Sequence, residues 1–285
     1  MYQGRRTYFP GEIDRALAGA PYLNGGLFTE NDLDRKPGFN VTDARFRHIF
    51  AFLQRYNFTI SEGSPLDQEV AVDPEMIGKV YESLVNVSEE TNERGQAGIF
   101  YTPRTEIDLM CRLALVDNLA NHLGHEHKNL LYEVVFAVEP DEKEAADRAL
   151  GEAGLWPAVD EHLRQLAIVD PACGSGSFLV GMMNVMVQLY RAIAEHQGLH
   201  ENEFALKKRI IAQNLYGVDV KDWAVRVCEL RLWLSLIIES EESQMDIYNQ
   251  PLLPNLTFKA RQGDSLVEEI AGVPLSLRRD YAHTP

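Results

Sequence analysis

Residues 166–177 read LAIVDPACGSGS, a short apolar run that ends in Asp170 and continues into a turn with two glycines. An apolar helix is predicted to follow over residues 177–196. Gly174 and Gly176 carry no Cβ atom, so the backbone can turn tightly there and approach a ligand closely. A strand, a glycine turn and a helix in this order predict the first unit of a parallel α/β sheet.

Two more strand-like runs that end in an acid follow downstream. Residues 215–219 read LYGVD and end in Asp219, and residues 256–264 read LTFKARQGD and end in Asp264. The intervening helices are predicted at about residues 201–213 and 221–239. Alternating strands and helices predict the start of a doubly wound parallel sheet, in which ligands bind at the carboxyl ends of the strands. The three acids fall at those ends.

The glycine pattern argues against two common classes of nucleotide-binding protein. A dinucleotide fingerprint, G-x-G-x-x-G, would need a third glycine where the sequence has Leu179. The chain also lacks the G-K-[ST] sequence of a phosphate-binding loop. At the end of the first strand, Asp170 suits a ligand with an ammonium group better than one with a pyrophosphate.

The chain ahead of the α/β region is predicted to be mainly helical. Phe46, Ile49, Phe50 and Leu53 recur at helical spacing and predict an amphipathic helix over residues 43–53. Asp73-Pro74 predicts the start of another helix. We therefore expect a helical region over residues 1–97 and a cofactor-binding α/β region over residues 98–285.

Two helix-forming stretches lie between these features. A long helix is predicted after Thr102-Pro103, with a natural stop at Gly124. Residues 139–164 are acidic and are predicted to be a solvated surface element, interrupted by Gly151, Gly154 and Pro157.

The formal net charge is −16, from 27 basic and 43 acidic residues. Binding of duplex DNA draws on neutralisation of phosphates by Lys and Arg, so this chain is poorly suited to hold DNA by itself. If DNA is the substrate, most of the contact must come from a local patch or from residues outside this chain.

The remaining composition predicts a cytoplasmic protein without a membrane partner or a metal site. No stretch approaches 18 uninterrupted apolar residues, and the first residues lack the apolar run of a secretory signal. The three cysteines are Cys111, Cys173 and Cys228; they are far apart and show no zinc-finger spacing. His122, His125 and His127 surround Gly124 and are interpreted as a solvated helix end.

The motifs resemble those of adenine-N6 DNA methyltransferases, as found in type I and type IIG restriction–modification methylases. Asp170-Pro-Ala-Cys-Gly-Ser-Gly176 resembles their first motif, and Gly98-Ile-Phe-Tyr-Thr-Pro103 resembles the motif that precedes it. Val218-Asp219 and Gly263-Asp264 resemble the second and third motifs. Residues 21–28 and 71–76 are similar to the helical region ahead of the methylase in single-chain type IIG enzymes.

The resemblance implies S-adenosylmethionine as the cofactor. Asp170 would bind its methionine ammonium group, Asp219 its ribose hydroxyls and Asp264 its adenine amino group. The residues expected to contact the cofactor are Tyr101, Thr102, Pro103, Asp170, Pro171, Ala172, Gly174, Gly176, Asp219 and Asp264. Of these, Tyr101 to Pro103 would close over the methionine end, where the following helix N-terminus favours a carboxylate.

The resemblance also implies parts that this sequence does not contain. Enzymes of this group carry an Asn-Pro-Pro-Tyr or similar motif that positions the flipped adenine, and the chain has no Asn-Pro-Pro. We expect the catalytic residues beyond residue 285, in a longer enzyme that contacts double-stranded DNA and has a nuclease domain or subunit. We expect the isolated chain to transfer no methyl group, to self-associate or bind cofactor weakly, and to end in a linker over residues 272–285.

Two alternative functions remain open from the sequence. The chain could be a non-catalytic interaction module, or a methyltransferase that acts on a small molecule, RNA or protein. Titration with S-adenosylhomocysteine separates the first alternative from a cofactor-binding domain.

Overall fold

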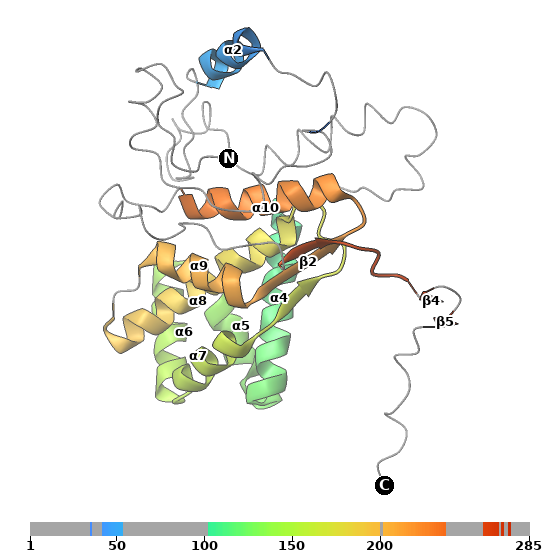
Figure 1. Cartoon of the computed structure of the whole chain (residues 1–285). Helices are drawn as coiled ribbons and strands as arrows, with labels where there is room; N and C mark the ends of the chain where they lie inside the picture. The colour runs from blue at the N-terminus through green and yellow to red at the C-terminus, as the bar shows by residue number, and fades with distance from the viewer. Residues whose placement is uncertain are drawn as a thin grey trace.

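The computed structural model describes residues 35, 42–53, 102–199, 202–237, 259–267, 269–270 and 273–274 (Figure 1). Its elements are α2 (Asp43–Leu53), α4 (Arg104–Leu123), η3 (His125–His127), α5 (Lys128–Phe136), α6 (Pro140–Glu152), α7 (Trp156–Gln165), β1 (Ile168–Asp170), α8 (Ser177–Gln197), α9 (Glu203–Gln213), β2 (Leu215–Asp219), α10 (Asp222–Ile237), β3 (Ala260–Gln262), β4 (Glu269–Ile270) and β5 (Val273–Pro274). The three strands, the glycine turn and the helices between them confirm the predicted order of elements.

The described part contains a parallel three-stranded sheet in the order β1-β2-β3. Asp170 pairs with Gly217, and Asp219 pairs with Gln262, so all three strands run toward the same edge. The connections from β1 to β2 and from β2 to β3 both move toward the same side of the sheet. Because such connections are right-handed, their helices lie on one face of the sheet. Accordingly, α8, α9 and α10 contact one another and β2. On the other face Val169 of β1 is 61% exposed, so the described part is α/β with one face covered by its crossover helices.

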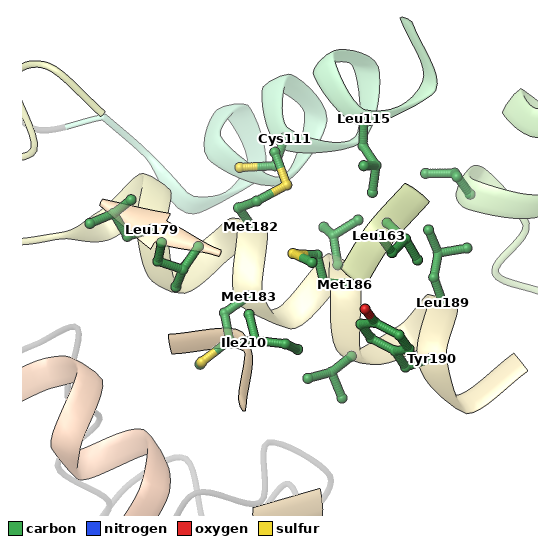
Figure 2. Close-up of a cluster of buried hydrophobic side chains, with 14 of the residues drawn as sticks. Cys111, Leu115, Leu163, Leu179, Met182, Met183, Met186, Leu189, Tyr190 and Ile210 are labelled. Carbon is green, nitrogen blue, oxygen red and sulfur yellow. The ribbon is translucent and has the colours of Figure 1, made fainter. Parts of the chain in front are cut away.

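Helix α8 is the centre of the hydrophobic core. Its buried side chains include Leu179, Met183, Met186 and Tyr190, which pack with residues of α4, α7 and α9 (Figure 2). By length and composition α8 could cross a membrane, but 61% of its apolar window is buried inside the protein. Burial in the core accounts for its apolar sequence.

A buried asparagine fixes the start of the sheet. The side-chain amide of Asn214 donates to the carbonyl oxygens of Leu163 at 2.9 Å and Leu166 at 2.6 Å. The backbone N–H of Ile168 donates to the carbonyl oxygen of Asn214 at 2.7 Å. These bonds satisfy a polar group in the core and hold the end of α7 beside the first residues of β1 and β2.

The prediction that residues 139–164 form a solvated surface element is wrong for their inner face. Leu150, Trp156 and Leu163 are fully buried, and Gly151 lies within α6 instead of interrupting it. The indole N–H of Trp156 also donates to the carbonyl oxygen of Asp147 at 3.1 Å. Helices α6 and α7 are both amphipathic, so their acidic residues lie outward while the apolar ones join the core.

The prediction near the N-terminus is confirmed, and the one near the C-terminus is partly wrong. The helix predicted over residues 43–53 is present as α2, with Phe46 and Ile49 about half exposed. The predicted linker over residues 272–285 is wrong at Val273–Pro274, which pairs antiparallel with Glu269–Ile270, as proline can at a sheet edge. The predictions for residues 21–28, for 71–76 with the helix start at Asp73-Pro74, and for residues 275–285 lie outside the described residues.

Candidate cofactor site at the carboxyl edge of the sheet

The structure brings the glycine loop, residues 170–176, together with the segments that follow β2 and β3. The backbone N–H of Gly174 donates to Asp219 Oδ2 at 2.9 Å. The hydroxyl of Ser265, next to Asp264, donates to the carbonyl oxygen of Pro171 at 2.7 Å. The segments that carry the three predicted strand-end acids therefore lie at one edge of the sheet.

Asp170 has one carboxylate oxygen that is satisfied and one that is not. Its Oδ1 accepts from the backbone N–H of Ala172 at 3.1 Å, while its Oδ2 is buried without a hydrogen-bond partner in the described part of the chain. Burial raises the pKa of Asp170 above its ordinary value, the Ala172 N–H opposes this, and the charge of Asp219 adds to it. A buried carboxylate oxygen without a partner is unfavourable, and a ligand cation would relieve it.

Asp219 is already engaged through both oxygens. Besides the bond from Gly174, its Oδ1 accepts from the backbone N–H of Lys221 at 2.9 Å. Each carboxylate oxygen has a second acceptor site, so Asp219 can still accept from ligand hydroxyls. The structure thus adds to the predicted ligand role a second role, which is to hold the glycine loop against β2.

The third acid and the residues ahead of α4 are less closely tied to the glycine loop. Asp264 is exposed, and its Oδ1 accepts from the backbone N–H of Leu266 at 2.9 Å. Thr102 and Pro103 lie directly before α4, and Tyr101 falls outside the described residues. Helix α4 contacts the start of α8, where the Cys111 thiol donates to the carbonyl oxygen of Phe178 at 3.6 Å.

The two loop glycines serve different purposes. Both have positive φ angles, 52° at Gly174 and 83° at Gly176, which favour glycine. A Cβ atom on Gly176 would lie 2.6 Å from Cys228 Sγ, so α10 packs directly under this residue. A Cβ atom on Gly174 would meet no atom of the described residues within 4 Å. Gly176 is thus required for packing, whereas Gly174 leaves open space beside the backbone that a ligand can enter.

Arg231 makes buried contacts that no motif of the sequence predicted. Its Nη1 donates to the carbonyl oxygen and hydroxyl of Ser175, at 3.1 and 3.0 Å, and to the hydroxyl of Ser177 at 2.8 Å. Arg231 and Ser175 are each 4% exposed. A single cation in the otherwise apolar run 230–234 (LRLWL) was the signal available in the sequence.

The cysteines near the loop are buried and unsuited to nucleophilic chemistry. A hydrogen bond with the Cys228 thiol, together with burial, raises the pKa of Cys173 well above its ordinary value. Burial likewise raises the pKa of Cys111 to about 12. Because the thiolate is the reactive form, these groups are structural.

The histidines around Gly124 lie away from the sheet edge. His122 stacks on His162 with ring centroids 3.9 Å apart, and His162 Nε2 lies 2.6 Å from Asn118 Oδ1. Within the described ranges, no group of three or more His, Cys, Asp or Glu side chains is arranged to hold a metal ion.

Comparison with known proteins confirms the resemblance to restriction–modification methyltransferases. Residues 146–260 match the family described as MmeI, DNA-methyltransferase domain. This range includes the glycine loop, β1, β2 and the crossover helices.

Three curated relatives agree with this match. A protein of Methanocaldococcus jannaschii, named "Putative type II restriction enzyme and methyltransferase", is 33% identical over 87% of this chain and 21% of its own length. DNA methyltransferase A of Bacillus subtilis is 22% identical over 85% of this chain and 23% of its own length. The adenine-specific methyltransferase PglX of Streptomyces coelicolor is 27% identical over 39% of this chain and 9% of its own length. The chain thus spans about a fifth of the length of the first two.

Proposed function

Because this chain is related to the DNA methyltransferases of type II restriction–modification systems, we propose that the carboxyl edge of its sheet binds S-adenosylmethionine. The observation that carries the proposal is the buried Oδ2 of Asp170, which has no hydrogen-bond partner among the described residues and lies beside a glycine loop with open space at Gly174 in that part of the chain. The ligand that this edge suits combines a cation with a nucleoside, and S-adenosylmethionine has both.

The proposed roles follow the chemistry of each group. Asp170 accepts from the methionine ammonium group through Oδ2, the oxygen without a partner in the part of the chain that the structure describes. Asp219 accepts from the ribose hydroxyls through its remaining acceptor sites, as acids at the end of a second strand do for other nucleotide cofactors. Asp264 accepts from the adenine amino group. When bound, S-adenosylmethionine supplies a methyl group activated by its sulfonium sulfur.

The remaining cofactor contacts belong to the loop and to the start of α4. Backbone atoms of the loop, at Pro171, Ala172, Gly174 and Gly176, line the cofactor in this proposal. Tyr101, Thr102 and Pro103 close the methionine end, where the N-terminus of α4 favours the carboxylate. The boundary between residues 97 and 98, outside the described residues, stays a prediction, with the helical region before it and the cofactor-binding region after it.

We further propose that the polypeptide carrying this chain methylates adenine N6 in double-stranded DNA within a restriction–modification or phage-defence system of the cytoplasm. The name of the adenine-specific relative and the order of the motifs support this specificity. The name of the Methanocaldococcus jannaschii relative, which combines restriction enzyme and methyltransferase, supports an associated nuclease domain or subunit. The acidic composition of this chain supports main DNA contacts elsewhere in such a polypeptide.

Two experiments test the proposal in order. Calorimetric titration of the 285-residue chain with S-adenosylhomocysteine is expected to show one site, and absence of binding would favour the non-catalytic interaction module. The polypeptide carrying this chain is then incubated with unmethylated DNA, RNA or protein and isotope-labelled S-adenosylmethionine. Label in N6-methyladenine of the DNA is the expected product, and label in cytosine, RNA or protein would contradict it.

A further inference from the structure

One face of α10 lies directly beneath the glycine loop. Cys228 and Arg231 are three residues apart in the helix and so share a face. The side chain of Cys228 lies under Gly176, and that of Arg231 reaches Ser175 and Ser177. The loop therefore rests on a helix from a different βα unit, 54 to 56 residues away in sequence.

We propose that Arg231 is a positioning residue that sets the conformation of the glycine loop for cofactor binding. The proposal rests on the proposed function, in that the ligand of the loop is taken to be S-adenosylmethionine. Arg231 itself is buried below the loop and acts through Ser175 and Ser177.

The geometry of the three contacts explains why an arginine suits this position. Nη1 carries two hydrogens and lies within 3.1 Å of three oxygens, so at least one hydrogen is shared. The contacts involve the backbone carbonyl of Ser175 and the hydroxyl groups at both ends of the turn around Gly176. The position of one guanidinium thereby fixes the path of the turn from Ser175 into α8.

The charge of Arg231 also fixes which way the hydrogen bonds run. A guanidinium only donates, so the hydroxyl oxygens of Ser175 and Ser177 both accept from it. Their own protons must then point to other acceptors. The two hydroxyl oxygens are 3.4 Å apart, so one can donate to the other, which leaves one proton for an acceptor outside the pair. Arg231 thus orders both the path of the loop and the donors that it presents.

Asp219 and Arg231 act on neighbouring parts of the same loop. Asp219 accepts from the backbone N–H of Gly174, and Arg231 donates to the carbonyl oxygen of Ser175. The two side chains thus bind adjacent residues of the loop from the unit formed by β2 and α10. A loop bound in this way is preorganised, which lowers the loss of entropy when a ligand binds.

The test combines ligand affinity with hydrogen exchange in the full chain. Arg231→Met removes the donors and keeps an apolar side chain. We expect S-adenosylhomocysteine to bind about tenfold more weakly, roughly the effect of losing one hydrogen bond to a charged group. We also expect faster hydrogen exchange in peptides covering residues 171–178, measured without ligand. Arg231→Lys should lie between wild type and Arg231→Met in both measurements, because an ammonium group can reach only part of the oxygen set.

Arg112→Met is the matched control. Arg112 is a second, mostly buried arginine that donates to the carbonyl oxygen of Val135 and, at 2.8 Å, to Gln188 Oε1. Gln188 lies 11 residues after Ser177 in α8, about 16 Å along the helix. We expect Arg112→Met to lower the melting temperature while ligand affinity and exchange over residues 171–178 stay as in wild type.

Ser177→Ala extends the test with a smaller change. Because Arg231 acts through this hydroxyl, Ser177→Ala should weaken ligand binding in the wild-type background and have a smaller effect in the Arg231→Lys background, where part of the contacts is already lost. Independent, additive losses of affinity would contradict the proposal. This comparison does not need Arg231→Met, so it tests the proposal even if that variant does not fold.

The remaining outcomes separate this proposal from the proposed function. If Arg231→Met lowers the melting temperature as Arg112→Met does, with affinity and loop exchange unchanged, Arg231 has no positioning role. If the wild-type chain binds no S-adenosylhomocysteine, the proposed function fails. In that case, hydrogen exchange over residues 171–178 still tests the role of Arg231 independently. Faster exchange in Arg231→Met supports that role, and unchanged exchange overturns it.

Discussion

Asp219 Oδ2 accepts a hydrogen bond from the backbone N–H of Gly174 at 2.9 Å, across 45 residues of sequence. The acid at the end of β2 and the loop after β1 are therefore one structural unit. A ligand that binds one of them is sensitive to the position of the other. This coupling makes the site testable through single substitutions.

Asp219→Asn should weaken both the fold and the site. The carboxylate accepts from two backbone N–H groups, those of Gly174 and Lys221, whereas an amide has one acceptor oxygen and would turn its NH₂ group toward an N–H donor. We expect a loss of about 2 kcal/mol in unfolding free energy and at least about tenfold weaker binding of S-adenosylhomocysteine, measured by denaturation and calorimetry. Asp222→Asn, at an exposed residue paired with Arg226 at 3.8 Å, is the control and should change neither quantity appreciably.

Asp170→Asn should stabilise the free protein while it weakens ligand binding. Burial raises the pKa of Asp170, so its ionised form is disfavoured in the folded state. The stability linked to this group is present at low pH and is lost as pH rises through the raised folded pKa. The melting temperature of Asp170→Asn relative to wild type should therefore increase as pH rises above the ordinary carboxyl range.

The affinity of Asp170→Asn for S-adenosylhomocysteine should fall by at least about tenfold at neutral pH, because the carboxylate that meets the ammonium group is gone. Asp160→Asn, at an acid paired with Arg164 within α7, is the control. A variant of Asp170 that binds ligand as wild type does would contradict the assigned role.

Gly176→Ala should destabilise the protein more than Gly154→Ala does. Both glycines have positive φ, 83° and 70°, so both substitutions strain the backbone by about 1 kcal/mol. Only at Gly176 does the added Cβ lie 2.6 Å from Cys228 Sγ, which adds about 1–3 kcal/mol of overpacking. Equal unfolding free energies of the two variants in urea would show that α10 does not pack under the loop as described.

Gly174→Ala separates stability from binding. Its φ is 52° and no atom of the residues that the structure describes lies within 4 Å of an added Cβ, so the loss of stability should match that of Gly154→Ala. The methyl group would occupy the open side of the loop, so S-adenosylhomocysteine should bind at least about tenfold more weakly by calorimetry. Unchanged affinity would place the ligand elsewhere.

The three thiols should be unreactive in the native protein. All three are buried, and burial raises the pKa of Cys111 to about 12. We expect no reaction with an aromatic disulfide reagent at pH 8, and reaction of all three thiols after unfolding, measured by absorbance and mass. Rapid labelling of Cys173 in the native state would indicate that the glycine loop opens readily.

The periodicity of the sequence predicted the elements around the site well. The limits of β2 were predicted as they are observed, and α8 ends within one residue of its predicted end. The prediction of a solvated surface element at residues 139–164 is wrong for its inner face, because it rested on the charged residues and not on the apolar ones between them. Trp156 and Leu163 belong to a stripe that only packing against α4 and α8 reveals.

By itself, the sequence determined the local features of this protein: a strand, a turn that needs positive φ at Gly174 and Gly176, and the helix that follows. These depend on neighbouring residues and on hydrophobic periodicity. Only the tertiary structure decided that Asp219 would bind the loop, that Arg231 would lie beneath it, and that one oxygen of Asp170 would have no partner among the described residues. Strand register and the packing of α10 bring together residues 45 to 56 positions apart, and no local stretch of sequence contains that information.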